Sequence, residues 1–439
     1  MNKNYKTLKQ LFIPIFLEIF FLNLVGSVDT MMLSSLNDNA VGGVGTSNTY
    51  MGVFTISFSV ISSGMIAVMT QYIGVGKPGV ARQAVKIGGL FNGVMGLIVS
   101  VVLFLYSEPI LILLGISSAL FEHAAVYTKI VGGACILNAI IPIVNCYLRA
   151  FGHSVGPLVA TIVGNVVNLV LNALFLFVFD MGVMGVAIAT VISRVVNFII
   201  LLIMSFLYIK IPKDAETIET GTVVKQIISI GFPAAMETAL YNLAMTIVMS
   251  LLNRMDEDGF NVTVKSYANL IANYSYIAGL AMAQANAIIT GWKIGEKKYD
   301  ECLKDTIKTS VYGIRVAVII SLIFVFSSPF IMIFFTDNKE MISVIQKVLI
   351  IDAFLEIGRV ANLVYGTALK TCGDAIYTVT IAVIFMYLFA VFGTYLFGIK
   401  LELLVIGCWI GLALDECARA ILMFNRWKSK KWESKVLIK

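Results

Sequence analysis

Twelve long apolar stretches constrain this chain more than any other feature of its sequence. Each holds about 20 or more mostly apolar residues, the length that an α-helix needs to cross the hydrocarbon core of a bilayer. Only 13% of the 439 residues are charged, whereas soluble proteins have about 25%. We therefore expect an all-α membrane protein. Its twelve spans are predicted at residues 11–33, 44–73, 85–106, 126–148, 155–179, 182–208, 224–252, 266–292, 309–334, 345–368, 375–398 and 401–425.

The basic residues between the spans predict the orientation. Cytoplasmic loops are enriched in Lys and Arg, and 22 of the 32 basic residues fall on one side of the predicted membrane against 5 on the other. We thus expect a multi-pass protein of the cell membrane with both termini in the cytoplasm. Because the net charge of +6 comes from these loops, we expect no nucleic-acid partner. The first apolar run is predicted to be a retained span and not a signal peptide, because no small-residue cleavage site follows it.

Polar landmarks repeat along the chain. The run Pro14–Glu18 recurs 219 residues later as Pro233–Glu237, and Leu148–His153 recurs 221 residues later as Leu369–Asp374. Six spans precede the polar connector and six follow it, so the two copies have the same orientation in the membrane. We expect two pseudo-symmetric six-helix lobes. The predicted parts are an N-terminal lobe (1–209), a cytoplasmic connector (210–223), a C-terminal lobe (224–427) and a basic cytoplasmic tail (428–439).

Four polar side chains of the first half lie at similar depth. Asp29, Asn168, Asn172 and Thr190 are roughly 6 to 16 Å from the outer ends of their spans, at 1.5 Å per helical residue. A carboxylate in hydrocarbon costs several kcal/mol by most accounts and marks a functional site. Acid, amide and hydroxyl oxygens can bind a small hard cation or hydrogen-bond a protonated carboxyl. These residues form a candidate ion-coupling site, with Na⁺ at Asp29 as the one metal considered.

The second half has no acid equivalent to Asp29, because Val248 occupies that position of the repeat. Its polar and aromatic residues suit a substrate cavity, since aromatic rings and Met give an adaptable wall and an acid can hold an organic cation. Helix packing is the alternative for most of them. The candidate cavity residues are Glu237, Tyr241, Asn242, Asn273, Tyr276 and Met282.

Charges of opposite sign within the spans predict ion pairs, which lower the cost of charge in lipid. Glu356 and Arg359 lie three apart on one helix face and are expected to pair. Two pairings between spans are also predicted, one of Glu18 with Arg194 and one of Glu237 with Arg419.

Four stretches carry a pattern that is specific in its order and spacing. They are Pro14 with Val28-Asp29-Thr30, Leu148–His153 running into Ile162–Asn172, Gly185–Thr190, and the ending Trp409–Glu416 with Arg419, Arg426-Trp427 and Lys431-Trp432. In this arrangement the chain resembles the multidrug and toxic compound extrusion (MATE) family over nearly its whole length.

The resemblance implies an antiporter that exports organic, often cationic, compounds by alternating access of two lobes, driven by an H⁺ or Na⁺ gradient. It implies ion coupling by Asp29, Asn168, Asn172 and Thr190, and bending of the first helix at Pro14. Many members have an acid where this chain has Asn172, which favours H⁺ over Na⁺. Some members have a seventh-span acid where this chain has Tyr241.

Two other functions are considered. A flippase for lipid-linked oligosaccharide shares the superfamily architecture. Its anionic lipid substrate is disfavoured here, because the spans hold only five basic residues, namely Lys129, Arg194, Arg315, Arg359 and Arg419. An enzyme is not expected, because no His, Cys and acid constellation has catalytic spacing. The six cysteines form no CxxC pair, so neither a disulfide nor a cofactor is predicted. We expect a monomer whose partners are small organic substrates and the lipid bilayer.

Overall fold

The computed structural model describes residues 5–255, 259–333 and 335–438 of the chain. Within these ranges the regular elements are all helices, without a strand. The expected all-α fold is confirmed, and each of the twelve predicted ranges is occupied by a helix or by a helix with its π-helical continuation. The residues divide into two compact units, Met1–Gly231 and Phe232–Lys439.

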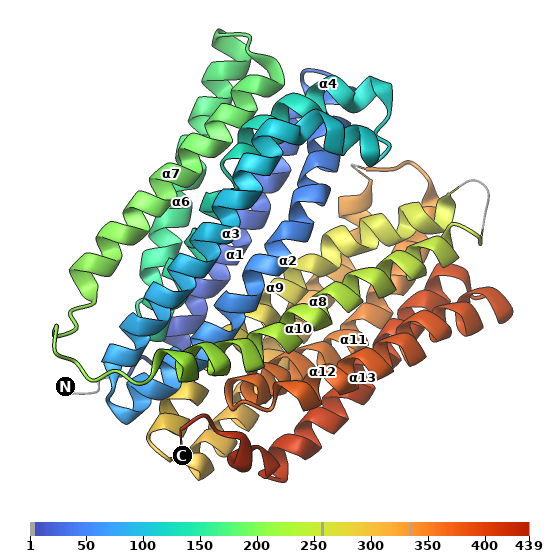
Figure 1. The fold of residues 1–439 in the computed structure, drawn as a ribbon. Coiled ribbons are helices and arrows are strands. Elements are labelled where there is room, and N and C mark those ends of the chain that lie inside the picture. The colour runs from blue at the N-terminus through green and yellow to red at the C-terminus, as the bar shows by residue number, and fades with distance from the viewer. Residues whose placement is uncertain (1–4, 256–258, 334, 439) are drawn as a thin grey trace. The chain divides into compact units, whose positions relative to one another are not determined.

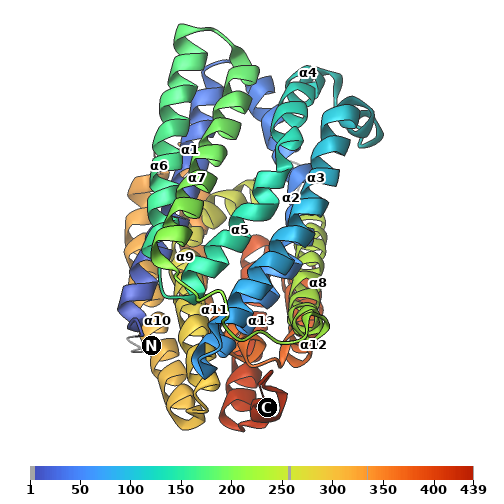
Figure 2. The same ribbon diagram turned by 60° about the vertical axis from the view of Figure 1, so that its left-hand side comes forward.

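The first unit is built around α5, which packs against α2, α3, α6 and α7, while α1 lies against α6 (Figures 1 and 2). Near its start α5 follows a 47° bend after α4 and η1. The elements are α1 (Leu8–Ser34), α2 (Asp38–Val75), α3 (Pro78–Leu113), α4 (Ser118–Tyr127), η1 (Thr128–Gly132), α5 (Cys135–Ala150), α6 (Val155–Ala173), η2 (Leu174–Val178), α7 (Gly182–Tyr208) and the start of α8 (Thr220–Leu252).

The second unit repeats this plan around α11, which packs against α9, α10, α12 and α13. Its elements, besides the rest of α8, are α9 (Phe260–Gly295), α10 (Tyr299–Met332), α11 (Lys339–Thr371), α12 (Ala375–Phe385), η3 (Met386–Val391), η4 (Thr394–Lys400), α13 (Leu404–Lys428) and η5 (Lys431–Lys435). The elements η1 to η4 are π-helical, and η5 is a 3₁₀ helix.

Eight helices of the described residues are long and apolar enough to cross a membrane, and the bent pair in the first unit raises this number to nine. Three further long helices, α9, α11 and α13, fall outside this set. Between them α11 and α13 hold five acids and three arginines. Their charges are therefore expected to be paired inside the protein and not exposed to lipid.

Local sequence signals explain where several helices begin and end. Thr7 and Gln10 form a capping box at the start of α1, and Asn37 accepts a hydrogen bond from the amide of Ala40 at 2.7 Å at the start of α2. The repeat is visible at the ends of α5 and α11, because Gly152 and Gly373 have φ of 81° and 97°. Both positions need the left-handed backbone that glycine adopts without strain.

The boundary between the two units falls inside α8, at Gly231 and Phe232, and not at the connector. The first turns of α8 approach α2 so closely that a Cβ added to Gly64 would lie 2.0 Å from the carbonyl oxygen of Ile227. The connector also contacts the first unit, where the Arg82 guanidinium donates to the carbonyl oxygens of Pro212 at 2.8 Å and Lys213 at 3.0 Å. These contacts place the connector with the first unit.

The basic tail packs against its own unit. Trp432 is fully buried, stacks on Trp427 with ring centroids 4.6 Å apart, and donates its indole N–H to the Trp427 carbonyl at 2.9 Å. The Tyr299 ring packs edge-on against the Trp432 ring, with ring centroids 5.8 Å apart. The residues that the sequence predicted as a tail are thus part of the hydrophobic core at this end of the second unit.

Candidate functional site

Asp29 of α1 contacts Asn172 of α6, which in turn contacts Asn168 on the same helix. The Asn172 side chain donates to the Asp29 carboxylate at 2.8 Å and to the Asn168 side-chain oxygen at 3.2 Å. Asn168 and Asn172 are buried, and Asp29 is half-buried. The structure thus brings together three of the four predicted coupling residues, because the two amides lie one turn apart on the helix that packs against α1.

The fourth residue, Thr190, reaches this neighbourhood through a tyrosine. Its hydroxyl donates to the carbonyl of Val186 on its own helix at 2.8 Å. The Tyr127 hydroxyl lies beside the side chains of Thr190 and Asn48, and Tyr127 is 4% exposed. No feature of the sequence points to Tyr127, which lies directly before the π-helical η1.

Arg194 belongs to the Asp29 neighbourhood and does not pair with Glu18. It lies one turn after Thr190 on α7 and interacts electrostatically with Asp29 and Tyr127. Its Nη1 atom is buried and finds no hydrogen-bond acceptor among the described residues. The site therefore contains a fixed positive charge as well as an acid.

Glu18 pairs with Arg149, so the predicted pair with Arg194 is wrong. The Glu18 carboxylate accepts a hydrogen bond from the Arg149 guanidinium at 2.7 Å, which joins α1 to the end of α5. The second unit repeats the contact, since the Lys370 ammonium lies 2.6 Å from the Glu237 carboxylate. The predicted pair of Glu237 with Arg419 is therefore also wrong. Each acid pairs instead with the base that ends the fourth span of its own unit.

Pro14 is buried inside α1, which continues as one helix from Leu8 to Ser34. Bending at Pro14 stays a prediction. One further contact between α1 and α6 was not predicted, because the Asn165 side chain donates to the Phe21 carbonyl at 3.1 Å. Glu18, Phe21 and Asp29 thus join α1 to its neighbours by polar contacts at three levels.

The candidate cavity residues of the second unit have different environments. Tyr241 and Asn242 are exposed on α8, and Asn273 and Tyr276 are half-buried on α9. The Arg359 guanidinium lies 5.8 Å from the centroid of the Tyr276 ring. Met282 is 1% exposed and packs close to Gly313 of α10, and its place in a cavity stays a prediction.

A buried group of charges on α11 and α13 is the largest polar feature of the second unit. We call it the α11–α13 cluster, which consists of Asp352, Glu356, Arg359, Asp415, Glu416 and Arg419. The structure contains the predicted ion pair of Glu356 with Arg359. The other members were not predicted to meet. The only sequence signal was the spacing of Asp415, Glu416 and Arg419, which puts both acids within one turn of the arginine.

Arg359 of α11 reaches an acid of α13, whereas Arg419 pairs with the acids of its own helix. Arg419 donates to Asp415 at 2.6 Å, and its Nη2 atom lies 3.0 Å from a carboxylate oxygen of Glu416. The Nε atom of Arg359 lies 3.8 Å from the same Glu416 oxygen. Two neutral donors complete the cluster, because Asn362 donates to Glu416 at 2.9 Å and Trp409 donates to Asp352 at 3.2 Å.

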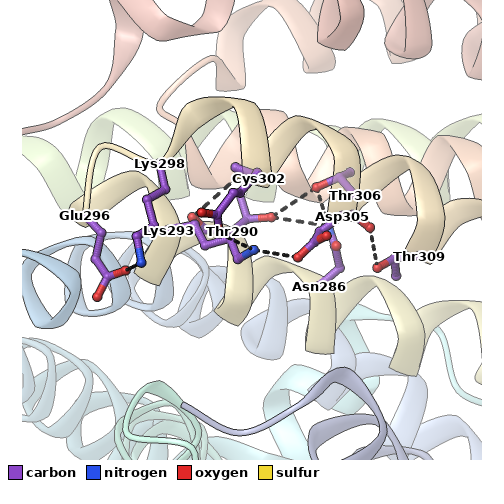
Figure 3. A network of polar contacts seen from close by, with 10 residues as sticks. Asn286, Thr290, Lys293, Glu296, Lys298, Cys302, Asp305, Thr306 and Thr309 are labelled. Atoms are coloured by element: carbon purple, nitrogen blue, oxygen red, sulfur yellow. Dashed lines mark hydrogen bonds and ion pairs between the residues drawn. The ribbon is translucent and has the colours of Figure 1, made fainter. Parts of the chain in front are cut away.

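A separate polar network joins the ends of α9 and α10 (Figure 3). Lys293 lies 2.5 Å from Asp305 and 3.2 Å from Glu301, and the Asn286 side chain donates to Thr306 at 3.4 Å. The hydroxyls of Thr290 and Thr306 are also 3.4 Å apart. Each of these contacts joins the two helices, so we assign this network to helix packing.

The six cysteines are free thiols. Residues 5–255, 259–333 and 335–438 contain no group of three His, Cys, Asp or Glu side chains arranged to hold a metal ion. In the site formed by Asp29, Asn168 and Asn172, the Asp29 carboxylate is therefore the single acid available to a bound cation.

The fold and the buried polar residues together define a class of protein. Two helical units with repeated landmarks, and buried acids and bases at span depth, are typical of secondary transporters built from internal repeats. The model of the MatE family matches the chain twice, over residues 14–174 and 233–396. The chain belongs to this family, the multidrug and toxic compound extrusion transporters, as its sequence pattern predicted.

Individual relatives agree with this assignment. The chain is 29% identical to the "Uncharacterized transporter YisQ" of Bacillus subtilis over 96% of this chain and 94% of that protein. It is 22% identical to the "Probable multidrug resistance protein NorM" of Thermotoga maritima over 99% and 94% of the two chains. Its fold matches an outward-facing multidrug resistance MATE family transporter with a TM-score of 0.83, at 20% identity over 98% and 96% of the chains.

Proposed function

We propose that the protein is a cation-coupled antiporter that exports organic compounds, cationic or amphipathic in character, across the cell membrane. Several relatives of similar length have names that contain multidrug resistance. The excess of basic residues in the loops on one side supports cytoplasmic termini. The coupling ion enters at Asp29, and alternating access of the two lobes moves the substrate outward.

The hydrogen bond between Asp29 and Asn172 carries the proposal. It joins α1 to α6 and depends on the charge of Asp29, because a carboxylate accepts from an amide N–H more strongly than a protonated carboxyl does. Binding of a cation or proton at Asp29 therefore weakens the contact between the two helices. A ligand that changes such a contact shifts the balance between conformations.

The surroundings of Asp29 favour H⁺ over Na⁺ as the coupling ion. Asp29 is the single acid of the site, and the charge of Arg194 acts on it. With Asp29 ionised the two side chains sum to zero, so Na⁺ would leave a net positive charge in a partly buried site, which is costly. Protonation leaves the same net charge but gives Asp29 a covalent O–H bond, which needs no further anionic ligand.

Efflux of a cationic dye tests this function. Purified protein in liposomes of bacterial lipid is loaded with ethidium, and release is followed under an imposed pH gradient or an imposed Na⁺ gradient. We expect release under the pH gradient without Na⁺, and loss of that release in Asp29→Asn. The matched control is Asp180→Asn, which removes an exposed acid in the turn between η2 and α7.

Two results would contradict the proposal. Normal gradient-driven efflux by a folded Asp29→Asn protein would remove Asp29 from coupling. Scrambling of a labelled polyprenyl-linked lipid, without ethidium release under either gradient, would instead indicate a flippase.

A further inference from the structure

One face of α10 carries three exposed basic side chains that have no acid partner. They are Lys304, Lys308 and Arg315, and we call them the basic stripe, because spacings of four and seven residues put them on the same face of the helix. None of the three has an ion pair or a hydrogen bond among the described residues. Asp300 interacts electrostatically with Lys304, but its carboxylate is in contact with Lys430.

Beyond the basic stripe the same face of α10 is apolar. The opposite face packs on α9 and α11. Exposed large apolar side chains mark a surface that borders another apolar phase, and for a span of this length and hydropathy that phase is the lipid. The exposed side chains recur every three or four residues, as Ile319, Leu322, Phe326 and Phe330.

Arg315 lies inside the predicted span at 309–334, roughly 9 Å from its cytoplasmic end at 1.5 Å per residue. An unpaired charge at that depth is costly in lipid, and long basic side chains reduce the cost by reaching toward the interface. Helical side chains lean toward the N-terminus of their helix, which for α10 is the predicted cytoplasmic end. The Arg315 side chain is therefore suited to reach the inner head groups, near the level of Lys308.

The acids around α10 are already used by other bases. Glu301 and Asp305 both pair with Lys293 of α9, at 3.2 and 2.5 Å. No further acid follows Asp305 on α10, and α9 contains none. The positive charge of the basic stripe is thus left for a group outside the described chain.

The first unit shows that a span in this position does not require a basic stripe. There α3 follows α2 as α10 follows α9, and Lys86 is its last basic residue. The exposed face beyond Lys86 continues with apolar side chains only, at Leu90, Val94, Leu97 and Val101. Helix packing and insertion therefore do not explain Lys308 and Arg315 of the second unit.

We propose that the basic stripe binds the head group of an anionic phospholipid in the inner leaflet. Lys and Arg form charge-assisted hydrogen bonds with phosphate oxygens, and a guanidinium can donate two of them in parallel. Tyr312 is exposed next to the stripe, and Tyr is enriched at this level of the membrane. The acyl chains then lie along the apolar face that begins at Ile319. This lipid site is separate from Asp29 and does not depend on the coupling ion.

Native mass spectrometry of the full-length protein in detergent tests the proposal. Dioleoylphosphatidylglycerol is titrated, and dioleoylphosphatidylcholine, with the same acyl chains and no net charge, serves as the reference lipid. We expect the phosphatidylglycerol to bind more tightly, and Lys308→Gln and Arg315→Gln each to weaken it about fivefold, which corresponds to about 1 kcal/mol per basic residue. The matched control is Lys86→Gln, which removes an exposed charge from α3 and should leave the affinity unchanged.

Thermal unfolding gives a second measurement and checks that the variants fold. Bound lipid stabilises the folded protein, so phosphatidylglycerol should raise the melting temperature of the wild type more than phosphatidylcholine does. Arg315→Gln should lose this difference. Its melting temperature without added lipid should equal that of the wild type, because the Arg315 side chain is exposed and makes no contact that the substitution would break.

Three results would overturn the proposal. Equal phosphatidylglycerol affinities of the wild type, Lys308→Gln and Arg315→Gln would show that the stripe does not bind the head group. An equal loss of affinity in Lys86→Gln would indicate attraction by net charge without a site. Displacement of the lipid by glycerol 3-phosphate, which lacks acyl chains, would indicate a site for a soluble anion instead.

Discussion

The Glu18 carboxylate accepts a hydrogen bond from the Arg149 guanidinium at 2.7 Å, which joins the start of the first span to the end of the fourth. The second unit contains the same contact between Glu237 and Lys370, at 2.6 Å. Both acids follow a proline by four residues, and both bases precede a glycine with positive φ by three. The repeat therefore preserves an interaction between two helices and not only a sequence pattern.

Breaking the Glu18–Arg149 pair should destabilise the protein. Arg149→Leu leaves the carboxylate of Glu18 buried without its cation, which typically costs about 3–5 kcal/mol. The double variant Glu18→Gln/Arg149→Leu removes both charges and should recover a large part of that loss. Thermal unfolding in detergent measures both. A double variant no more stable than Arg149→Leu would show that the two side chains are not energetically coupled.

A second carboxylate beside Asp29 should change the ion dependence. In Asn172→Asp, the new acid replaces the amide that lies 2.8 Å from Asp29, and two carboxylates with the Asn168 oxygen suit a hard cation such as Na⁺. We expect Na⁺ to stimulate ethidium efflux by about tenfold, which corresponds to about 1.4 kcal/mol of added affinity, while the wild type stays insensitive. Asn172→Leu is the control that removes the amide without adding charge. Equal Na⁺ responses in Asn172→Asp and wild type would contradict this account.

A single sequence specifies some contacts of the site and not others. Asp29 and Asn172 were predicted to meet because depth along a span follows from residue number, and the family resemblance supplied the pairing of helices. Depth alone does not say which helices are neighbours, and Arg149 lies just beyond the end of a predicted span, so the sequence does not reveal that Arg149 is the partner of Glu18. Similarly, the sequence places Asp415 and Glu416 on one helix, but only the packing of α11 on α13 reveals the excess of acids.

Burial of the tail should matter for stability. Trp432→Ala removes a fully buried indole that stacks on Trp427 and donates to its carbonyl, and such a substitution typically costs about 3–5 kcal/mol. Lys431→Ala, its exposed neighbour, should change stability by less than about 0.5 kcal/mol. Melting temperatures of the two variants provide the comparison. Equal stabilities would mean that residues beyond α13 do not contribute to the core of the second unit.

The close approach of α2 and α8 depends on glycine at one position. A Cβ at Gly64 would lie 2.0 Å from the Ile227 carbonyl oxygen and 2.8 Å from its carbonyl carbon, and backbone atoms cannot move away as a flexible side chain can. Gly64→Ala should therefore separate the two helices and destabilise the first unit by about 1–3 kcal/mol, as overpacking does.

Gly52 provides the control, because it lies on the same helix with no atom within 4 Å of an added Cβ. There, alanine should stabilise the helix by about 0.5–1 kcal/mol, because it has the better helix propensity. Opposite shifts in melting temperature for the two variants are expected. A stable, normally folded Gly64→Ala protein would show that the first turns of α8 do not pack tightly on α2.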